Sequence, residues 1–157
     1  MIDTAALISR YHTLAELTFS ETAAARGIDN TPNEEALANL RRLAHGLDSV
    51  RDLLGRTLCI SSAYRSPALN AAVRGVPGSQ HSLGLAADFT CDDFGPSITI
   101  ARAIHASDIV FDQCILEYGR WIHLSFSDTP RRRAMTIYDA RAGYLDGIWD
   151  ETGTRVA

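Results

Sequence analysis

The chain has 157 residues, a formal net charge of −4, 46% hydrophobic residues and 22% charged residues. This length can bury a sizeable core, so neither a metal nor a disulfide is needed merely to fold the chain. No apolar run approaches the roughly 20 residues of a membrane span, and the negative charge gives no electrostatic reason to expect nucleic acid as the main partner. We therefore expect a soluble protein with no membrane insertion and no nucleic-acid partner.

The cysteines and the basic residues form no obvious binding motif. Cys59, Cys91 and Cys114 are odd in number, widely spaced and set among apolar neighbours, which argues against a disulfide framework and against a zinc finger. We expect three buried free thiols. The basic cluster Arg131-Arg132-Arg133 is predicted to be a solvated turn rather than a binding site.

Helices are predicted for the first third of the chain. Two short ones are expected at about residues 4–13 and 20–26, the second ended by Gly27. A third begins at Thr31-Pro32-Asn33-Glu34, which has capping-box spacing with proline at the first helical position, and its apolar residues recur at helical intervals up to Leu54.

From Thr57 the apolar residues alternate with a period of two, which predicts a strand running toward Arg65. Short helices are expected from Ser66 to about Gly75 and at about 96–106. The remaining strands are predicted at about 85–91, 112–118, 120–126 and 134–139. Because the last three strands have short connections, we expect antiparallel pairing and an α+β fold, with N-terminal helices packed on a small antiparallel sheet.

Strand parity separates polar from apolar residues around two motifs. In the strand at 85–91, Asp88 lies on the face opposite to Leu85, Ala87, Phe89 and Cys91, and His123 lies opposite to its apolar neighbours in the strand at 120–126. Asp88 and His123 can therefore share the face of the sheet that is turned away from the core. His81 is seven residues from Asp88, about 23 Å in extended chain, so a turn at Gly84 has to fold it back.

Two imidazoles and one carboxylate are a ligand set that suits zinc with one position left for water. The simpler alternative is that each of these residues makes ordinary hydrogen bonds at the surface, as most single histidines and strand carboxylates do. Spacing and parity alone indicate a metal site but no particular reaction.

Two longer stretches resemble the M15 zinc peptidases, the group of D-alanyl-D-alanine carboxypeptidases and phage endolysins whose fold is shared with the Hedgehog signalling domain. They are SSAYRSPALNAAVRGVPGSQHSLGLAADF and FDQCILEYGRWIHLSF. The family pattern Ser-x-His-x-x-Gly-x-Ala-x-Asp is present at Ser79, His81, Gly84, Ala86 and Asp88, and the later Trp-x-His at Trp121 and His123. The resemblance reaches upstream to FSETAAARGIDNTPNEEALANLRRLA, similar to the M15A-like branch, and extends to about residue 127.

The resemblance implies one zinc ion held by His81, Asp88 and His123, and cleavage of peptide bonds next to D-amino acids in peptidoglycan stem peptides. It also requires a carboxylate as general base, for which Glu117 is the candidate. Many family members carry this acid three residues before the last histidine, where this chain has Arg120. A hairpin turn at Gly119 would return Glu117 to the metal; the alternative is a structural salt bridge.

The same resemblance assigns Arg65 to a substrate carboxylate or to the oxyanion, a role that suits its planar fork of donors. The alternative is a solvated arginine at a strand end. Ser79 and Gln80 are expected either to donate to substrate or to support His81. Trp121 is expected to line the cleft or to cover it.

We therefore expect a single zinc peptidase domain over residues 1–157, with a helical front at 1–55, a sheet region holding the metal site at 56–139 and a C-terminal tail at 140–157. The expected substrate is peptidoglycan, and the expected state is a monomer. No signal peptide pattern is visible, which fits synthesis in the cytoplasm and action on the cell wall as a phage or prophage lysin, after release or as a virion component. The alternative is a metal-binding module or virion structural protein of the same fold that has lost catalysis.

Overall fold

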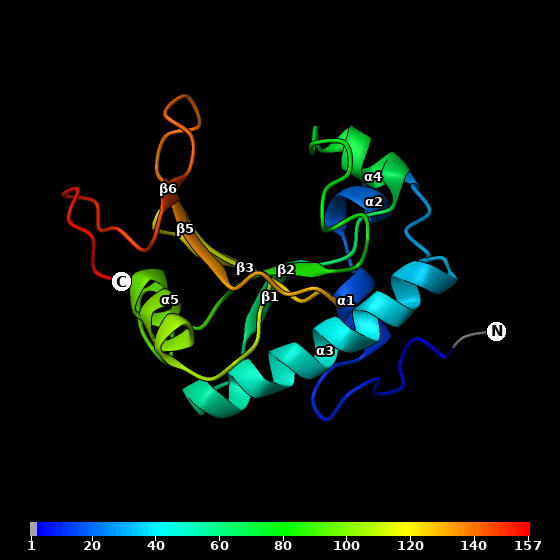
Figure 1. The fold of residues 1–157 in the computed structure, drawn as a ribbon. Helices are drawn as coiled ribbons and strands as arrows, with labels where there is room; N and C mark the ends of the chain where they lie inside the picture. The colour runs from blue at the N-terminus through cyan, green and yellow to red at the C-terminus, as the bar shows by residue number, and fades with distance from the viewer. Residues whose placement is uncertain (1–2) are drawn as a thin grey trace.

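Three helices precede the first strand in the computed structural model, which describes residues 3–157 (Figure 1). They are α1 (Leu14–Thr18), α2 (Glu21–Arg26) and α3 (Glu34–Leu54). Side chains of Thr13, Ser20 and Asn33 cap their first turns, because each accepts a hydrogen bond from a backbone N–H that has no partner inside the helix. The predicted helix at 20–26 and the long third helix are confirmed.

The predicted helix at 4–13 is wrong, and Asp48 on α3 supplies the reason. Its carboxylate accepts hydrogen bonds from the backbone N–H groups of Arg10 and Tyr11 and from the hydroxyl of Ser9. These bonds hold the segment in turns, so that helix α1 starts only at Leu14.

The start of α3 also differs by two residues from the prediction. Asn33, not Thr31, is the N-cap, and its side chain accepts from the Ala36 N–H at 2.8 Å. Pro32 therefore precedes the cap instead of occupying the first helical position.

Six strands and two further helices follow. The strands are β1 (Cys59–Ser62), β2 (Ala86–Thr90), β3 (Gln113–Glu117), β4 (Trp121–Ser125), β5 (Arg133–Ile137) and β6 (Leu145–Asp146), and the helices are α4 (Pro67–Ala72) and α5 (Ser97–Ala106). The strands form one sheet in the order β1-β2-β4-β3-β5-β6. The α+β class is confirmed, and the short strand β6 lies in the segment predicted as the C-terminal tail.

The sheet is mixed, so the prediction of antiparallel pairing is wrong for one pair of strands. β5 pairs in parallel with β3, whereas the other pairs are antiparallel. β4 already has β2 and β3 on its two sides, and it ends where β3 begins. The chain therefore returns along the free side of β3 in the same direction as β3, and the Arg133 N–H donates to the Asp112 carbonyl at the start of this pairing.

The hydrophobic core lies between one face of the sheet and the helices α3 and α5, which run across it in Figure 1. Leu40, Leu43 and Leu47 of α3 pack there with Phe89 and Leu124 of the sheet, and all five are fully buried. No helix among residues 3–157 combines the length and the apolar character needed to cross a membrane. The other face carries polar side chains beside a small apolar cluster of Ile115, Met135 and Ile137.

Two expectations about single residues need correction. All three cysteines are free, as predicted, but Cys59 is exposed because β1 is the edge strand of the sheet. The arginine cluster is not simply solvated. Arg131 pairs with Asp112, and Arg132 donates to the carbonyls of His105 and Ser107 at the end of α5.

Candidate metal centre

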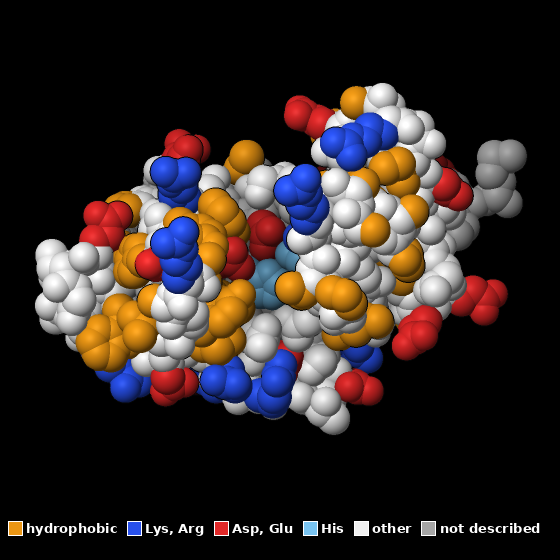
Figure 2. Space-filling view, turned by 90° about the horizontal axis from the view of Figure 1, so that it is seen from above, with side chains coloured by type: hydrophobic (Ala, Val, Ile, Leu, Met, Phe, Trp, Pro, Cys, Tyr) orange, Lys and Arg blue, Asp and Glu red, His pale blue; other side chains and the backbone are white. Residues whose placement is uncertain are grey.

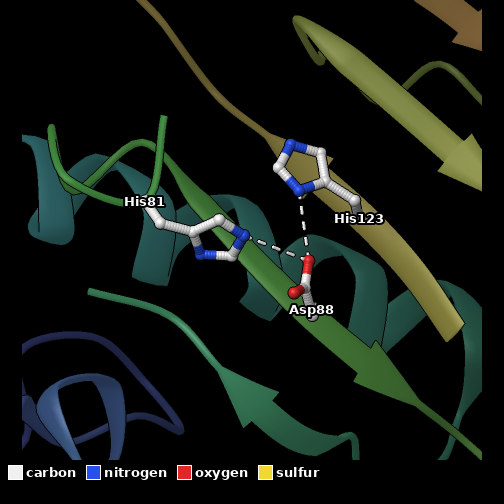
Figure 3. A group of neighbouring side chains, drawn as sticks. All are labelled: His81, Asp88 and His123. Carbon is white, nitrogen blue, oxygen red and sulfur yellow. Dashed lines mark hydrogen bonds and ion pairs between the residues drawn. The ribbon is translucent and has the colours of Figure 1, made fainter. Parts of the chain in front are cut away.

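His81, Asp88 and His123 meet on the face of the sheet opposite to the core (Figure 3). Asp88 of β2 and His123 of β4 are directly paired across the two strands. Asp88 Oδ1 lies 3.1 Å from His123 Nδ1 and 3.2 Å from His81 Nε2, and the three atoms all lie within 4.8 Å of one another. The structure therefore brings together the three residues that the sequence singled out.

A turn at Gly84 returns His81 to Asp88. Gly84 has a φ of +74°, and a Cβ atom there would lie 2.6 Å from the carbonyl oxygen of Ala36 on α3. Its N–H donates to the His81 carbonyl, while the Leu85 N–H donates to the Gln80 carbonyl. Only glycine fits a left-handed conformation packed so closely against a helix, so the turn predicted from the sequence is present and needs this residue.

Each histidine is oriented by a hydrogen bond on the side away from Asp88. His81 Nδ1 donates to the carbonyl oxygen of Ala63 at 2.7 Å, and His123 Nε2 lies 3.2 Å from Oε1 of Gln80. These partners turn His81 Nε2 and His123 Nδ1 to the inner side, where each would present a lone pair to a metal ion. Ligands of tetrahedral zinc at about 2.0 to 2.1 Å lie about 3.3 Å from one another, which matches the two distances to Asp88. The donor set and the two distances to Asp88 fit zinc.

The three residues lie at the floor of a cavity of about 400 Å³. In Figure 2 the histidine side chains are visible at the bottom of a hollow between two raised parts of the surface, with acidic side chains beside them. The cavity is also lined by the remaining residues predicted for the site, which are Arg65, Ser79, Gln80, Glu117 and Trp121.

Comparison with known proteins places this arrangement in a family. The family model for Peptidase M15 matches residues 10–125, which include the triad and the helical front. This chain belongs to the M15 peptidases. The family consists of zinc-dependent peptidases, in agreement with the ligand set on the sheet. A search of curated proteins gave no match.

The charge on Asp88 in this M15 peptidase is set by two opposing effects. Burial by itself would raise the pKa of the carboxyl, but hydrogen bonds and charge from His123 and His81 outweigh it and lower the pKa well below its usual range. Asp88 is thus ionised at neutral pH, as a metal ligand must be.

Glu117 reaches the cavity through the hairpin between β3 and β4. Tyr118 and Gly119 form its turn with φ values of 55° and 65°, and the Arg120 N–H donates to the Glu117 carbonyl. Glu117 pairs with Trp121, two residues before His123 on β4, so the three side chains share one face. Arg120, at the position where many family members carry the acid, is exposed at the turn. Burial and the nearby Asp88 charge raise the pKa of Glu117.

Arg65 is held at the cavity wall by contacts that strand parity did not predict. β1 ends at Ser62 after an irregularity between Ile60 and Ser62, so the alternation does not extend to Arg65. Instead, its backbone N–H donates to the His81 carbonyl, its Nη1 donates to Asn70 Oδ1 at 3.3 Å, and its Nη2 lies 4.0 Å from Asp88 Oδ2. Arg65 therefore faces the triad with its charge only loosely paired.

Sequence reasoning missed several groups around the site. Asn70 positions Arg65. Gly75 makes room for the Asn70 side chain, because a Cβ atom at Gly75 would lie 2.0 Å from Asn70 Oδ1. Tyr144 lines the cavity from the connection between β5 and β6, a loop that projects from the sheet in Figure 1. Asn70 and Gly75 lie within the stretch that carries the resemblance, where a polar residue in a short helix was a usable signal. Tyr144 lies beyond the matched residues, and no motif indicated it.

Ser79 and Gln80 lie beside the ligands. The Ser79 hydroxyl accepts from the His81 N–H at 3.3 Å, and the Gln80 amide bonds to His123 and to Asp112. Both residues thus support the histidines in this structure, one of the two roles expected for them.

Proposed function

We propose that this chain is a zinc peptidase that hydrolyses peptide bonds in peptidoglycan stem peptides. One zinc ion would be held by His81 Nε2, Asp88 Oδ1 and His123 Nδ1. The observation that carries the proposal is the meeting of these three atoms with an acid, Glu117, and a cation, Arg65, around one cavity. A ligand set without these two groups would suit metal storage or structure equally well.

Bound zinc would acidify water and polarise the scissile carbonyl. Glu117 would accept a proton from the attacking water and pass it to the leaving amine. Its raised pKa brings it nearer to the operating pH, which favours both halves of this transfer. The carboxylate of Asp88 remains ionised throughout because its own pKa is lowered.

Arg65 supports a substrate that carries a carboxylate, as stem peptides do. Its side chain is 19% exposed, and its nearest acid partner is 4.0 Å away at Asp88, so donors remain available to a substrate carboxylate or to an oxyanion. Trp121 and Tyr144 would flank the bound peptide as apolar walls with polar edges.

The biological setting follows from the sequence resemblance to phage endolysins. We infer a monomeric phage or prophage lysin that acts on the cell wall after release or as a virion component. The bond cleaved, whether L-alanyl-D-glutamate, D-alanyl-D-alanine or a cross-bridge, depends on the loops around the cleft.

Digestion of purified peptidoglycan tests the proposal. The wild-type protein should carry about one zinc per chain and release new amino groups. A zinc chelator should abolish this release, and added zinc should restore it. Mass spectrometry of the muropeptides would identify the bond. His81→Ala should lose metal and activity, while His45→Ala, at an exposed position on α3, should keep both. Zinc binding without any release of amino groups would instead support an inactive metal-binding module.

A further inference from the structure

A chain of hydrogen bonds leads from His123 to the protein surface through residues outside the ligand set. His123 Nε2 lies 3.2 Å from Gln80 Oε1, and Gln80 Nε2 donates to Asp112 Oδ2 at 2.8 Å. Asp112 in turn accepts from Arg131 by both Nε at 2.8 Å and Nη2 at 2.7 Å, and from the Arg131 backbone N–H at 3.0 Å. Figure 3 shows that the His123 nitrogen engaged in this chain is the one turned away from Asp88.

The chemistry of these groups gives the chain a single direction. An ionised carboxylate has only acceptors, so Asp112 requires the NH₂ side of the Gln80 amide to face it. The carbonyl side of Gln80 must then face His123, and a carbonyl can only accept. With Nδ1 bound to zinc, the proton of His123 would therefore lie on Nε2, where the Gln80 carbonyl accepts it.

We propose that Gln80 and Asp112 are positioning residues that hold His123 in the tautomer and ring orientation required to present Nδ1 to zinc. This inference rests on the proposed zinc site. Hydrogen-bond partners behind a metal-ligating histidine fix its tautomer and raise its basicity, and their loss typically costs about 10- to 100-fold in metal affinity.

The burial of Asp112 supports a specific role for Arg131. Asp112 is 3% exposed and stands at the start of β3, whereas the Arg131 side chain is half exposed. A buried carboxylate without donors or a cation tends to take up a proton. Protonated Asp112 could donate to Gln80 and reverse the amide. The hydrogen bonds and charge of Arg131 lower the pKa of Asp112 and keep it an acceptor.

A purely structural role predicts a different pattern of mutant effects. The Asp112–Arg131 pair also anchors the segment between β4 and β5, and anchoring would be lost equally when either partner is removed. The positioning role, in contrast, depends on the acceptor character of Asp112 and on the amide of Gln80. Two kinds of substitution separate the roles.

Asp112→Asn and Gln80→Met are the variants expected to break the chain. In Asp112→Asn, an NH₂ group can face Gln80 and turn its amide, so that His123 is offered a donor in place of an acceptor. Gln80→Met has similar length but no hydrogen bonds, and it leaves the Asp112–Arg131 pair intact. Arg131→Ala removes the salt bridge and is the control for anchoring. It keeps the hydrogen bonds that Asp112 accepts from Gln80 and from the backbone N–H of residue 131, which hold the carboxylate ionised at neutral pH.

Two measurements on full-length protein test the proposal. Zinc affinity from chelator competition should fall about 10- to 100-fold in Asp112→Asn and Gln80→Met and stay close to wild type in Arg131→Ala. Nitrogen-15 spectra of His123 in the zinc-loaded protein should show a protonated Nε2 whose proton exchanges slowly with water in wild type and Arg131→Ala, and faster exchange in the other two.

Equal losses of affinity in Arg131→Ala and Asp112→Asn would overturn the positioning role in favour of anchoring. Unchanged exchange of the Nε2 proton in Gln80→Met would also overturn it, and this variant keeps the test valid if Asp112→Asn does not fold. If wild-type protein binds no zinc, the zinc site itself is refuted; if wild type and all three variants bind zinc equally well, only the positioning role is refuted.

Discussion

The two faces of the sheet differ in what their side chains do, although they are built from alternate residues of the same strands. Leu116 and Glu117 are neighbours on β3, as are Ile122 and His123 on β4. The first of each pair is completely buried against the helices, and the second lines the metal cavity. Burial of apolar area stabilises the first face, while the second holds ionised groups at the expense of desolvation. Stability and chemistry are thus separated by a single residue step.

Leu116→Ala gives the largest expected effect on stability. The side chain is fully buried in the core cluster, so its removal should lower the free energy of unfolding by about 2 to 5 kcal/mol. Urea denaturation of the zinc-loaded protein would measure the loss. Zinc content and turnover per folded molecule should remain near wild type, since the residue points away from the cavity. An equal loss of turnover and stability would contradict the separation of the two faces.

Glu117→Gln, one residue further along β3, should lower turnover and leave stability near wild type. Loss of the general base should lower turnover by about 10²- to 10⁴-fold, as measured by amino-group release from peptidoglycan. Zinc content should stay near one per chain. Stability should be unchanged or slightly raised above about pH 5, because burial raises the pKa of Glu117 and so disfavours its charged form in the folded state.

Glu35→Gln, at an exposed position in the first turn of α3, is a matched control that should keep full turnover. Retained activity in Glu117→Gln would assign the base to another residue, and lost zinc would give Glu117 a structural role.

The features that sequence could predict are those that depend on neighbours along the chain. Alternation placed Asp88 and His123 on the polar face, and Gly84 marked the turn that returns His81. Helix caps such as Ser20 and the stop at Gly27 are equally local. A resemblance was still needed to connect the two motifs to a reaction, since parity alone fits many polar faces.

The features that sequence could not predict depend on contacts between distant residues. Asp48 binds backbone groups 37 and 38 residues away and prevents a helix that local propensity favours. β5 pairs in parallel with β3 because the edge of β3 opposite to β4 is free. Which edge is free is known only once the sheet is assembled. Tyr144 joins the cavity because β5 and β6 carry its loop there. Asp112 and Arg131, 19 residues apart, meet at the start of β3 for the same reason.

The Asp112–Arg131 pair lies at the start of β3, and its effect on stability should depend on pH. Arg131 lowers the pKa of Asp112 below its ordinary value of 3.8 in the folded state. A carboxyl with a depressed folded pKa adds stability that is fully present above its unfolded pKa and is lost as the pH falls through the folded pKa.

In metal-free protein, Asp112→Asn should therefore cost about 1.5 to 3 kcal/mol at pH 7, and the difference in stability from wild type should narrow toward about pH 3. Denaturation midpoints at successive pH values measure this, with Asp128→Asn at an exposed position as control. Because Asp88 is present in both proteins, its own pH dependence cancels in the difference. A cost that stays constant down to acid pH would mean that the charge of Asp112 contributes little to stability. The geometry of its hydrogen bonds would then account for the whole effect.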